Sequence, residues 1–198
     1  MISELQKNEQ WNSVSLGIPG IHNAENALAC VAVARELGID ESTIRTALDT
    51  FKGVKRRFDV HVVSDDVVYI DDYAHHPTEI KSLIDSIRLL YPSKQILGVF
   101  QPHLFTRTRD FFEGFAEELS RLDELMLLPI YPARELPIPG VTSDALLDKI
   151  ALDKKRVIPR DEVPASLNDL SNTVLLTIGA GDIDRIVPTL IEQFAEKA

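Results

Sequence analysis

The sequence contains a single cysteine, Cys30, among its 198 residues. One cysteine excludes a disulfide framework, and no set of cysteine and histidine residues has the spacing of a zinc site, so we expect no metal ligands in this chain. Cys30 lies in an alanine-rich helical pattern and is predicted to be a small buried apolar residue. This sparse use of cysteine is typical of a reducing compartment, and we expect a cytoplasmic protein.

Long apolar runs and an excess of basic residues are also missing. No apolar stretch approaches the roughly 20 residues of a membrane span, and residues 1–7 lack the apolar segment of a signal peptide, so we expect no membrane association. The formal net charge of −10 argues against general nucleic-acid binding, which needs a basic surface to neutralise phosphates. A local basic pocket for a nucleotide remains compatible with this charge.

The sequence does have a hydrophobic content of 44%, enough for a core, and a length that suits one ordinary domain and part of another. Helical patterns cover residues 21–37 and 40–51. The basic connector Gly53–Phe58 follows them and is the predicted domain boundary.

Strand and helix patterns alternate from Phe58 onward, which predicts an α/β fold with a mostly parallel sheet covered by helices on both faces. The first two strands are separated only by Ser64–Asp66 and should form a hairpin, so the sheet is expected to be mixed, with one antiparallel edge. The expected strands are 58–63, 67–72, 95–100, 124–129, 155–158 and 173–178, and the expected helices are 77–90, 108–120, 143–151, 161–169 and 183–195.

The run Asp71–Glu79 follows the strand 67–72 and contains two carboxylates, a phenol and two imidazoles before the helix that Pro77 opens. Ligands of open α/β sheets bind beyond the carboxyl ends of the strands, so this cluster lies where chemistry is expected. A simpler alternative is that His76–Glu79 only begins a helix, with polar side chains satisfying its free N–H groups.

A second polar turn, Gln101–Arg109, follows the strand 95–100. If the two strands are adjacent and parallel, His103, Arg107 and Arg109 would face Asp72, His75 and His76 of the first turn. Arginine suits a carboxylate or phosphate, which it binds in a bidentate manner, and a cation near a helix N-terminus opposes the macrodipole unless an anion is present. The alternative is a pair of solvated arginines at a helix start.

A glycine-rich turn, Gly179–Gly181, follows the last strand. It is consistent with a phosphate-binding turn, but glycines also permit a tight strand-to-helix turn without a ligand. Asp182 is predicted to be the N-cap of the last helix.

Taken in order, these motifs resemble the ATP-dependent Mur ligases of peptidoglycan synthesis, and most of all the members that join L-alanine to UDP-N-acetylmuramate. One departure is Leu104, where many relatives have a second arginine. The motifs that carry the resemblance are His22–Ala27, Phe51–Phe58, Asp71–Glu79, Phe100–Thr108, Ile130–Glu135 and Ile178–Asp182.

The family has three domains, and its phosphate loop belongs to the central one. No Gly-x-x-x-x-Gly-Lys-Ser/Thr segment occurs in this sequence. The resemblance therefore implies that residues 1–54 are the C-terminal remnant of the central ATP-binding domain and that residues 55–198 are the Rossmann-like C-terminal domain. ATP and Mg²⁺ would be bound mainly by the missing part of the central domain, and this chain alone is expected to be inactive.

The resemblance also implies a role for each candidate residue. The catalytic candidates are His75, His103 and Arg107, which with Tyr73 would line the L-alanine pocket. The nucleotide-binding candidates are Asn23 and Asn26 for the adenine edge, Arg56 or Arg57 for a phosphate, and Asp72 for the ribose hydroxyls or for holding a neighbouring histidine. Simpler alternatives are helix capping for the asparagines and a solvated linker for the arginines.

Two other functions are compatible with the sequence. One is the related ligase that recycles murein tripeptide onto UDP-muramate, and the other is a nucleotide- or peptide-binding module without catalysis. Tyr73 and the pair Arg107-Thr108 favour the alanine-adding enzyme. The missing phosphate loop favours the binding module for this chain taken alone.

Overall fold

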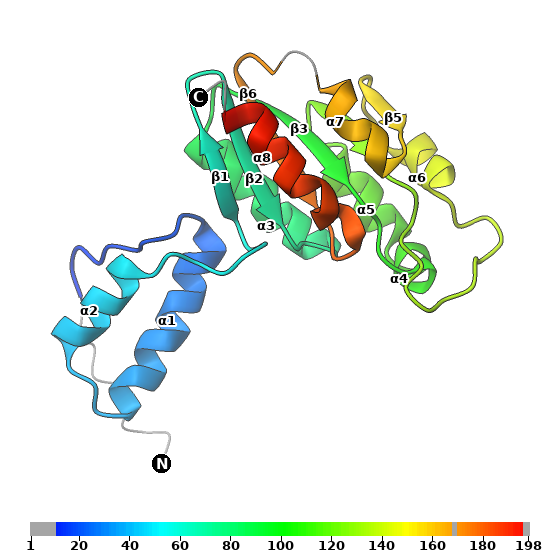
Figure 1. Ribbon diagram of the computed structural model, residues 1–198. Coiled ribbons are helices and arrows are strands. Elements are labelled where there is room, and N and C mark those ends of the chain that lie inside the picture. The colour runs from blue at the N-terminus through cyan, green and yellow to red at the C-terminus, as the bar shows by residue number, and fades with distance from the viewer. Residues whose placement is uncertain (1–10, 168–169, 196–198) are drawn as a thin grey trace. The chain divides into compact units, whose positions relative to one another are not determined.

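The computed structural model describes residues 11–167 and 170–195. The chain divides into two compact units, Met1–Gly53 and Val54–Ala198, and the division falls at the start of the basic connector (Figure 1).

The first unit contains two helices, α1 (Ile21–Glu36) and α2 (Glu41–Thr50), at the predicted positions. Asp40 caps α2 by accepting a 3.0 Å hydrogen bond from the backbone N–H of Thr43. Hydrogen bonds from Ser42 and Thr43 hold the pKa of Asp40 well below its usual range. A capped start of this kind stabilises a short helix.

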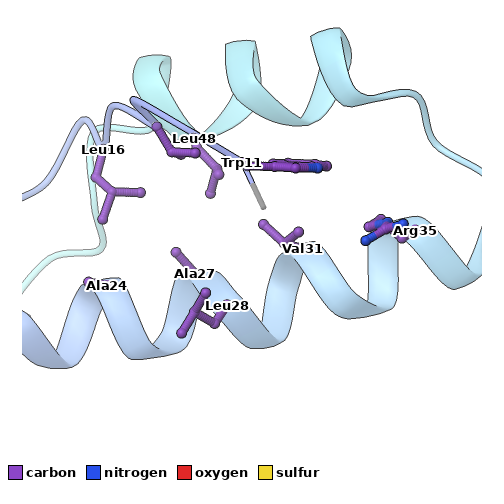
Figure 2. Close-up of a pocket in the computed structure, with 9 residues that line it drawn as sticks. Trp11, Leu16, Ala24, Ala27, Leu28, Val31, Arg35 and Leu48 are labelled. Carbon is purple, nitrogen blue, oxygen red and sulfur yellow. The ribbon is translucent and has the colours of Figure 1, made fainter. Parts of the chain in front are cut away.

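The two helices bury little apolar surface between them. Among the described residues of this unit, only Ile44 is buried, whereas Leu28 and Leu37 of the α1 region are 71% and 74% exposed. An open apolar cavity of about 380 Å³ lies between α1 and the segment that contains Trp11 and Leu16, as Figure 2 shows. The prediction that Cys30 is buried is wrong, because an apolar helix pattern does not ensure that a partner covers it.

The second unit is built on a six-stranded sheet of order β1-β2-β6-β3-β4-β5. Only β1 is antiparallel to its neighbour, and it carries a bulge between Val60 and Val62. The mixed sheet with one antiparallel edge is therefore confirmed. The strands are β1 (Asp59–Val63), β2 (Val67–Asp72), β3 (Gln95–Phe100), β4 (Glu124–Leu127), β5 (Lys155–Val157) and β6 (Thr173–Ile178).

Helices cover both faces of this sheet, as predicted, because alternate strand residues point to opposite sides. In β6, Val174 and Leu176 pack in the core with α3 (Pro77–Leu90), α5 (Phe112–Leu119) and α6 (Ser143–Lys149). Leu175 belongs to the core on the other face, with α7 (Val163–Ser166), the 3-10 helix η2 (Asp182–Ile186) and α8 (Val187–Ala195). Figure 1 shows α8 on the near side of the sheet and α3 behind it.

Three predicted helices differ in detail from the structure. The helix expected at 108–120 begins earlier, as α4 (Phe105–Asp110), and breaks before α5. The helix expected at 161–169 is a 3-10 turn, η1 (Arg160–Glu162), followed by the single turn of α7, and its last two positions, 168 and 169, lie outside the described residues. The last helix starts as η2 and becomes α-helical at Val187, because Pro188 has no N–H to donate to an earlier turn.

Candidate functional site

The candidate site lies at the carboxyl ends of β2, β6 and β3. The expectation that β2 and β3 are adjacent is wrong, because β6 enters the sheet between them. The three strand ends are nevertheless tied together: Gly179 N–H donates to the Asp72 carbonyl and Gln101 N–H to the Ile178 carbonyl, each at 3.0 Å. The two polar turns therefore share one edge of the sheet.

Four predicted residues come together at this edge. The rings of Tyr73 and His75 lie edge-on with centroids 5.4 Å apart, and the His75 and His103 centroids are 6.4 Å apart. Arg107 Nη1 is 3.3 Å from His103 Nδ1. No role was predicted for Tyr131, but its ring stacks on the His103 ring, with the centroids 5.7 Å apart. Its place in the turn that follows the predicted strand 124–129, within the motif Ile130–Glu135, was the available signal.

The start of α3 separates the two histidines of the first turn. His76 is the N-cap, with Nδ1 accepting from the Thr78 N–H at 3.2 Å. The Glu79 carboxylate accepts from the backbone N–H groups of His75 and His76, at 2.8 and 3.1 Å, which completes a capping box. The helix-start alternative is therefore confirmed for His76 and Glu79, whereas the His75 ring lies between Tyr73 and His103.

The contacts of the two site histidines fix their tautomers. A carbonyl oxygen only accepts, so the 2.8 Å contact with the Tyr73 carbonyl puts a proton on His75 Nδ1 and leaves the lone pair on Nε2. A guanidinium only donates, so Arg107 binds the lone pair of His103 Nδ1, and the neutral ring then carries its proton on Nε2. His75 Nε2 can thus accept a proton, and His103 Nε2 can donate a hydrogen bond.

Electrostatics favour the neutral form of His103. Partial burial lowers the pKa of His103 from its ordinary value, and the positive charge of Arg107 and the neighbouring His75 lower it further. The opposing effect of the Glu135 carboxylate is smaller. Glu135 accepts hydrogen bonds from the Thr106 N–H and hydroxyl, which lower the pKa of Glu135 and fix the first turn of α4.

The expected conflict between Arg107 and a helix N-terminus is absent. The helix α4 has only six residues, so Arg107 lies as close to its last turn as to its first, and the macrodipole gives no argument for an anion. The residue before α4, Leu104, has a φ of +72°, a strained value for leucine. What supports an anion site at Arg107 is therefore its half-buried position beside His103, rather than its place in the helix.

Asp72 braces the backbone of the site. One carboxylate oxygen accepts from the Phe58 N–H at 2.7 Å, and the other accepts from the Ala74 N–H at 2.8 Å. These contacts hold the end of β2 against the start of the unit and orient the turn that carries Tyr73 and His75. A second lone pair on each oxygen is chemically able to accept from a ribose hydroxyl.

The other nucleotide-binding candidates differ in exposure. Arg56 is half-buried and Arg57 is exposed. Asn23 and Asn26 belong to the first unit, where Asn23 Nδ2 donates to the Pro19 carbonyl at 2.6 Å and Asn26 is exposed. Asn23 thus donates to a backbone carbonyl just before α1, but it does not cap the free N–H groups at the start of that helix.

The prediction that Asp182 is an N-cap is wrong. Its carboxylate accepts a 2.8 Å hydrogen bond from Gln101 Nε2 and pairs with Arg160, and Gly181 precedes η2 without a side-chain cap. Gln101, which is buried, also accepts from the Ile183 N–H at 2.9 Å. A Cβ atom on Gly179 would lie 2.7 Å from the Gln101 carbonyl oxygen, so close packing accounts for glycine there.

The described residues do not fit a metal centre of their own. Across residues 11–167 and 170–195, no group of three or more His, Cys, Asp and Glu side chains is arranged to hold a metal ion. In the same part of the chain, every helix is too short or too polar to cross a membrane.

Comparisons with known proteins agree on one family. Residues 56–183 match the family model described as Mur ligase, glutamate ligase domain. A UDP-N-acetylmuramate–L-alanine ligase of Flavobacterium johnsoniae is 45% identical over 188 residues, which are 95% of this chain and 42% of that protein. A second ligase of that name, from Flavobacterium psychrophilum, is 48% identical over 96% of this chain and 42% of its own length. The chain thus spans less than half the length of these relatives.

Solved structures agree with the sequence comparisons. The crystal structure of UDP-N-acetylmuramate–alanine ligase MurC from Thermotoga maritima superposes with a TM-score of 0.80 and 28% identity, over 96% of this chain and 42% of that one. The match extends over both compact units, since it covers nearly all residues. By its family model, its sequence relatives and its fold, the chain belongs to the Mur ligase family.

Proposed function

We propose that this chain is the C-terminal part of an ATP-dependent ligase that joins L-alanine to UDP-N-acetylmuramate through an acyl phosphate. The observation that carries the proposal is the cluster of Tyr73, His75, His103 and Arg107 at one sheet edge of a Mur ligase domain. The names of the most similar relatives support the choice of L-alanine.

The reaction joins two anionic substrates, and this chain supplies the amino-acid half of the site. The Arg107 guanidinium binds the carboxylate of L-alanine, which its planar fork matches. His75 Nε2 accepts a proton from the ammonium group, leaving a free amine that attacks the acyl carbon. A C–N bond forms, the C–O bond to phosphate breaks, and phosphate leaves with the electron pair and takes up the second proton that the nitrogen releases as the amide forms. His103 Nε2–H donates to the oxygen on which charge develops.

The domain organisation is part of the same proposal. We assign residues 1–54 to the C-terminal end of the central ATP-binding domain and residues 55–198 to the C-terminal domain. The exposed apolar residues of the α1 region, Leu28, Val33 and Leu37, support this assignment, because a complete domain covers such surface. ATP and Mg²⁺ would be held mainly by the remainder of the central domain, and a cytoplasmic location follows from the nucleotide-linked substrate.

Asn23, Asn26 and one of the two arginines Arg56 and Arg57 are the donors of this chain that we assign to the nucleotide, and Asp72 is the acceptor for its ribose. An amide is able to donate and accept on an adenine edge, and a guanidinium matches a phosphate. The polar groups needed for each role are present, and none of these roles requires a metal held by this chain.

The test is ATP-dependent ligation by the full-length protein that contains this chain. We expect ADP and phosphate to form only when UDP-N-acetylmuramate, L-alanine and ATP are all present. The purified 198-residue chain is the control and should be inactive, because it has no phosphate-loop lysine to hold the β- and γ-phosphates. Turnover by this chain alone, or none by the full-length protein, would contradict the proposal, and the second result would favour a binding module.

A further inference from the structure

Two adjacent arginines at the start of the second unit have opposite environments. The Arg56 side chain is 20% exposed and turned into the unit. The Arg57 side chain is exposed, and in the described part of the chain it makes no hydrogen bond or ion pair. In the sequence analysis, both residues were candidates for contact with a nucleotide phosphate.

The Arg56 guanidinium joins three elements of the sheet edge. Nε donates to an Asp71 carboxylate oxygen at 3.3 Å, and Nη2 donates to the Gly179 carbonyl at 2.5 Å. Nη1 lies 3.8 Å from the Asp184 carboxylate. These partners come from the end of β2, the turn after β6, and η2 respectively.

Breaking the ion pair between Arg56 and Asp71 would be energetically costly. Asp71 is 1% exposed, and its other carboxylate oxygen accepts a 2.6 Å hydrogen bond from the Thr177 hydroxyl. Thr177 in turn contacts the hydroxyl of the buried Tyr69 at 3.1 Å. Removing one partner of such a pair leaves an uncompensated buried charge, which is strongly unfavourable. The Arg56 guanidinium is therefore held in place by the fold.

The same guanidinium also holds Tyr73. It lies over the Tyr73 ring, 4.9 Å from the centroid, and the Arg56 carbonyl accepts a 2.7 Å hydrogen bond from the Tyr73 N–H. The backbone φ of Arg56 is +61°, a value that a non-glycine residue keeps only when its surroundings fix it. Arg56 thus holds Tyr73 through both its backbone and its ring, and the ring also lies close to His75.

We infer that Arg56 is a positioning residue that holds Tyr73 in the amino-acid pocket, and that Arg57 is the arginine of the pair available to a nucleotide phosphate. The inference rests on the proposed ligase function. It divides two neighbouring residues between the two substrates: Arg56 acts on the L-alanine side through Tyr73, and Arg57 acts on the ATP side.

The test compares Arg56→Lys with its matched control, Arg57→Lys, in the full-length enzyme. Lysine keeps the charge but loses the planar fork and most of the stacking. We expect Arg56→Lys to raise the KM for L-alanine about tenfold with the ATP KM within twofold of wild type. Arg57→Lys should do the reverse. A lower melting temperature with both KM values unchanged would mean a merely structural role for Arg56 and would overturn the inference, as would a raised ATP KM in Arg56→Lys.

A second variant covers the case in which Arg56→Lys does not fold. Tyr73→Leu removes the ring that Arg56 holds and should raise the L-alanine KM by a similar factor, again with the ATP KM unchanged. An unchanged L-alanine KM in Tyr73→Leu would overturn the inference. Ligation of L-alanine by the wild-type enzyme is measured first, so a failure of the proposed function is distinguished from a failure of this assignment.

Discussion

Arg107→Lys in the full-length enzyme should raise the KM for L-alanine about 30-fold and change the KM for ATP little. The lysine keeps the charge but not the bidentate geometry, and the loss of about 2 kcal/mol from a charge-assisted pair corresponds to that factor. The family resemblance implies a second arginine at the position of Leu104 in many relatives, so we expect Arg107 to carry more of the carboxylate binding here. Arg107→Ala should be worse, because it also removes the charge.

Arg109 provides the matched control for this prediction. It has the same charge two residues further on, but it is exposed and pairs with Asp110 at 2.7 Å. Arg109→Lys should leave both KM values unchanged. Steady-state kinetics with L-alanine and ATP varied in turn provide the measurement. Normal L-alanine binding by Arg107→Lys would show that this arginine does not hold the carboxylate.

His75→Gln should lower kcat by about 100-fold or more, which is the usual contribution of a positioned general base. The neutral His75 ring has its lone pair on Nε2, because Nδ1 donates to the Tyr73 carbonyl. A glutamine amide cannot take a proton from an ammonium group at neutral pH. His103→Gln should lower kcat less, by about tenfold, because glutamine still offers an N–H donor in place of His103 Nε2–H.

The most specific part of this prediction is that His75→Gln lowers kcat more than His103→Gln does. His76→Asn is the control, since asparagine is a good N-cap and the His76 side chain caps α3 and packs on Phe111. Its kcat should match that of the wild type in the same assay. If His103→Gln is the more damaging of the two substitutions, the tautomers assigned from the Tyr73 carbonyl and from Arg107 do not describe the reacting state.

The strand and helix patterns predicted the α/β fold because each strand and helix depends mainly on residues that are close together in the sequence. Strands β2, β3 and β6 are short apolar runs in the sequence, and their bounds were predicted correctly. The strand order was not predictable in this way, because the insertion of β6 between β2 and β3 depends on pairing between distant residues, such as Val67 with Thr173 and Gln95 with Thr173. The expected adjacency of strands β2 and β3 was therefore wrong, although the two polar turns do share one edge of the sheet.

The site residues show the same division between local and distant causes. The grouping of His75 with His103 followed from the rule that strand carboxyl ends share an edge. The role of Asp182 was missed because its carboxylate accepts a hydrogen bond from Gln101 in the turn after β3, and that contact replaces the local helix cap. The argument from a helix N-terminus at Arg107 failed for a local reason: α4 begins three residues earlier than predicted and is too short.

The separate roles of Arg56 and Arg57 could not be read from the sequence either. Both belong to one basic connector, and nothing in the pattern distinguishes them. The distinction comes from the buried carboxylate of Asp71, which takes one guanidinium out of solvent and leaves the other exposed.

The most direct test of the account is the substrate preference of the full-length enzyme. ADP formation is measured with UDP-N-acetylmuramate and ATP fixed, and with either L-alanine or murein tripeptide as the second substrate. The account predicts a much higher kcat/KM for L-alanine. A preference for the tripeptide would contradict it and would identify the recycling ligase instead.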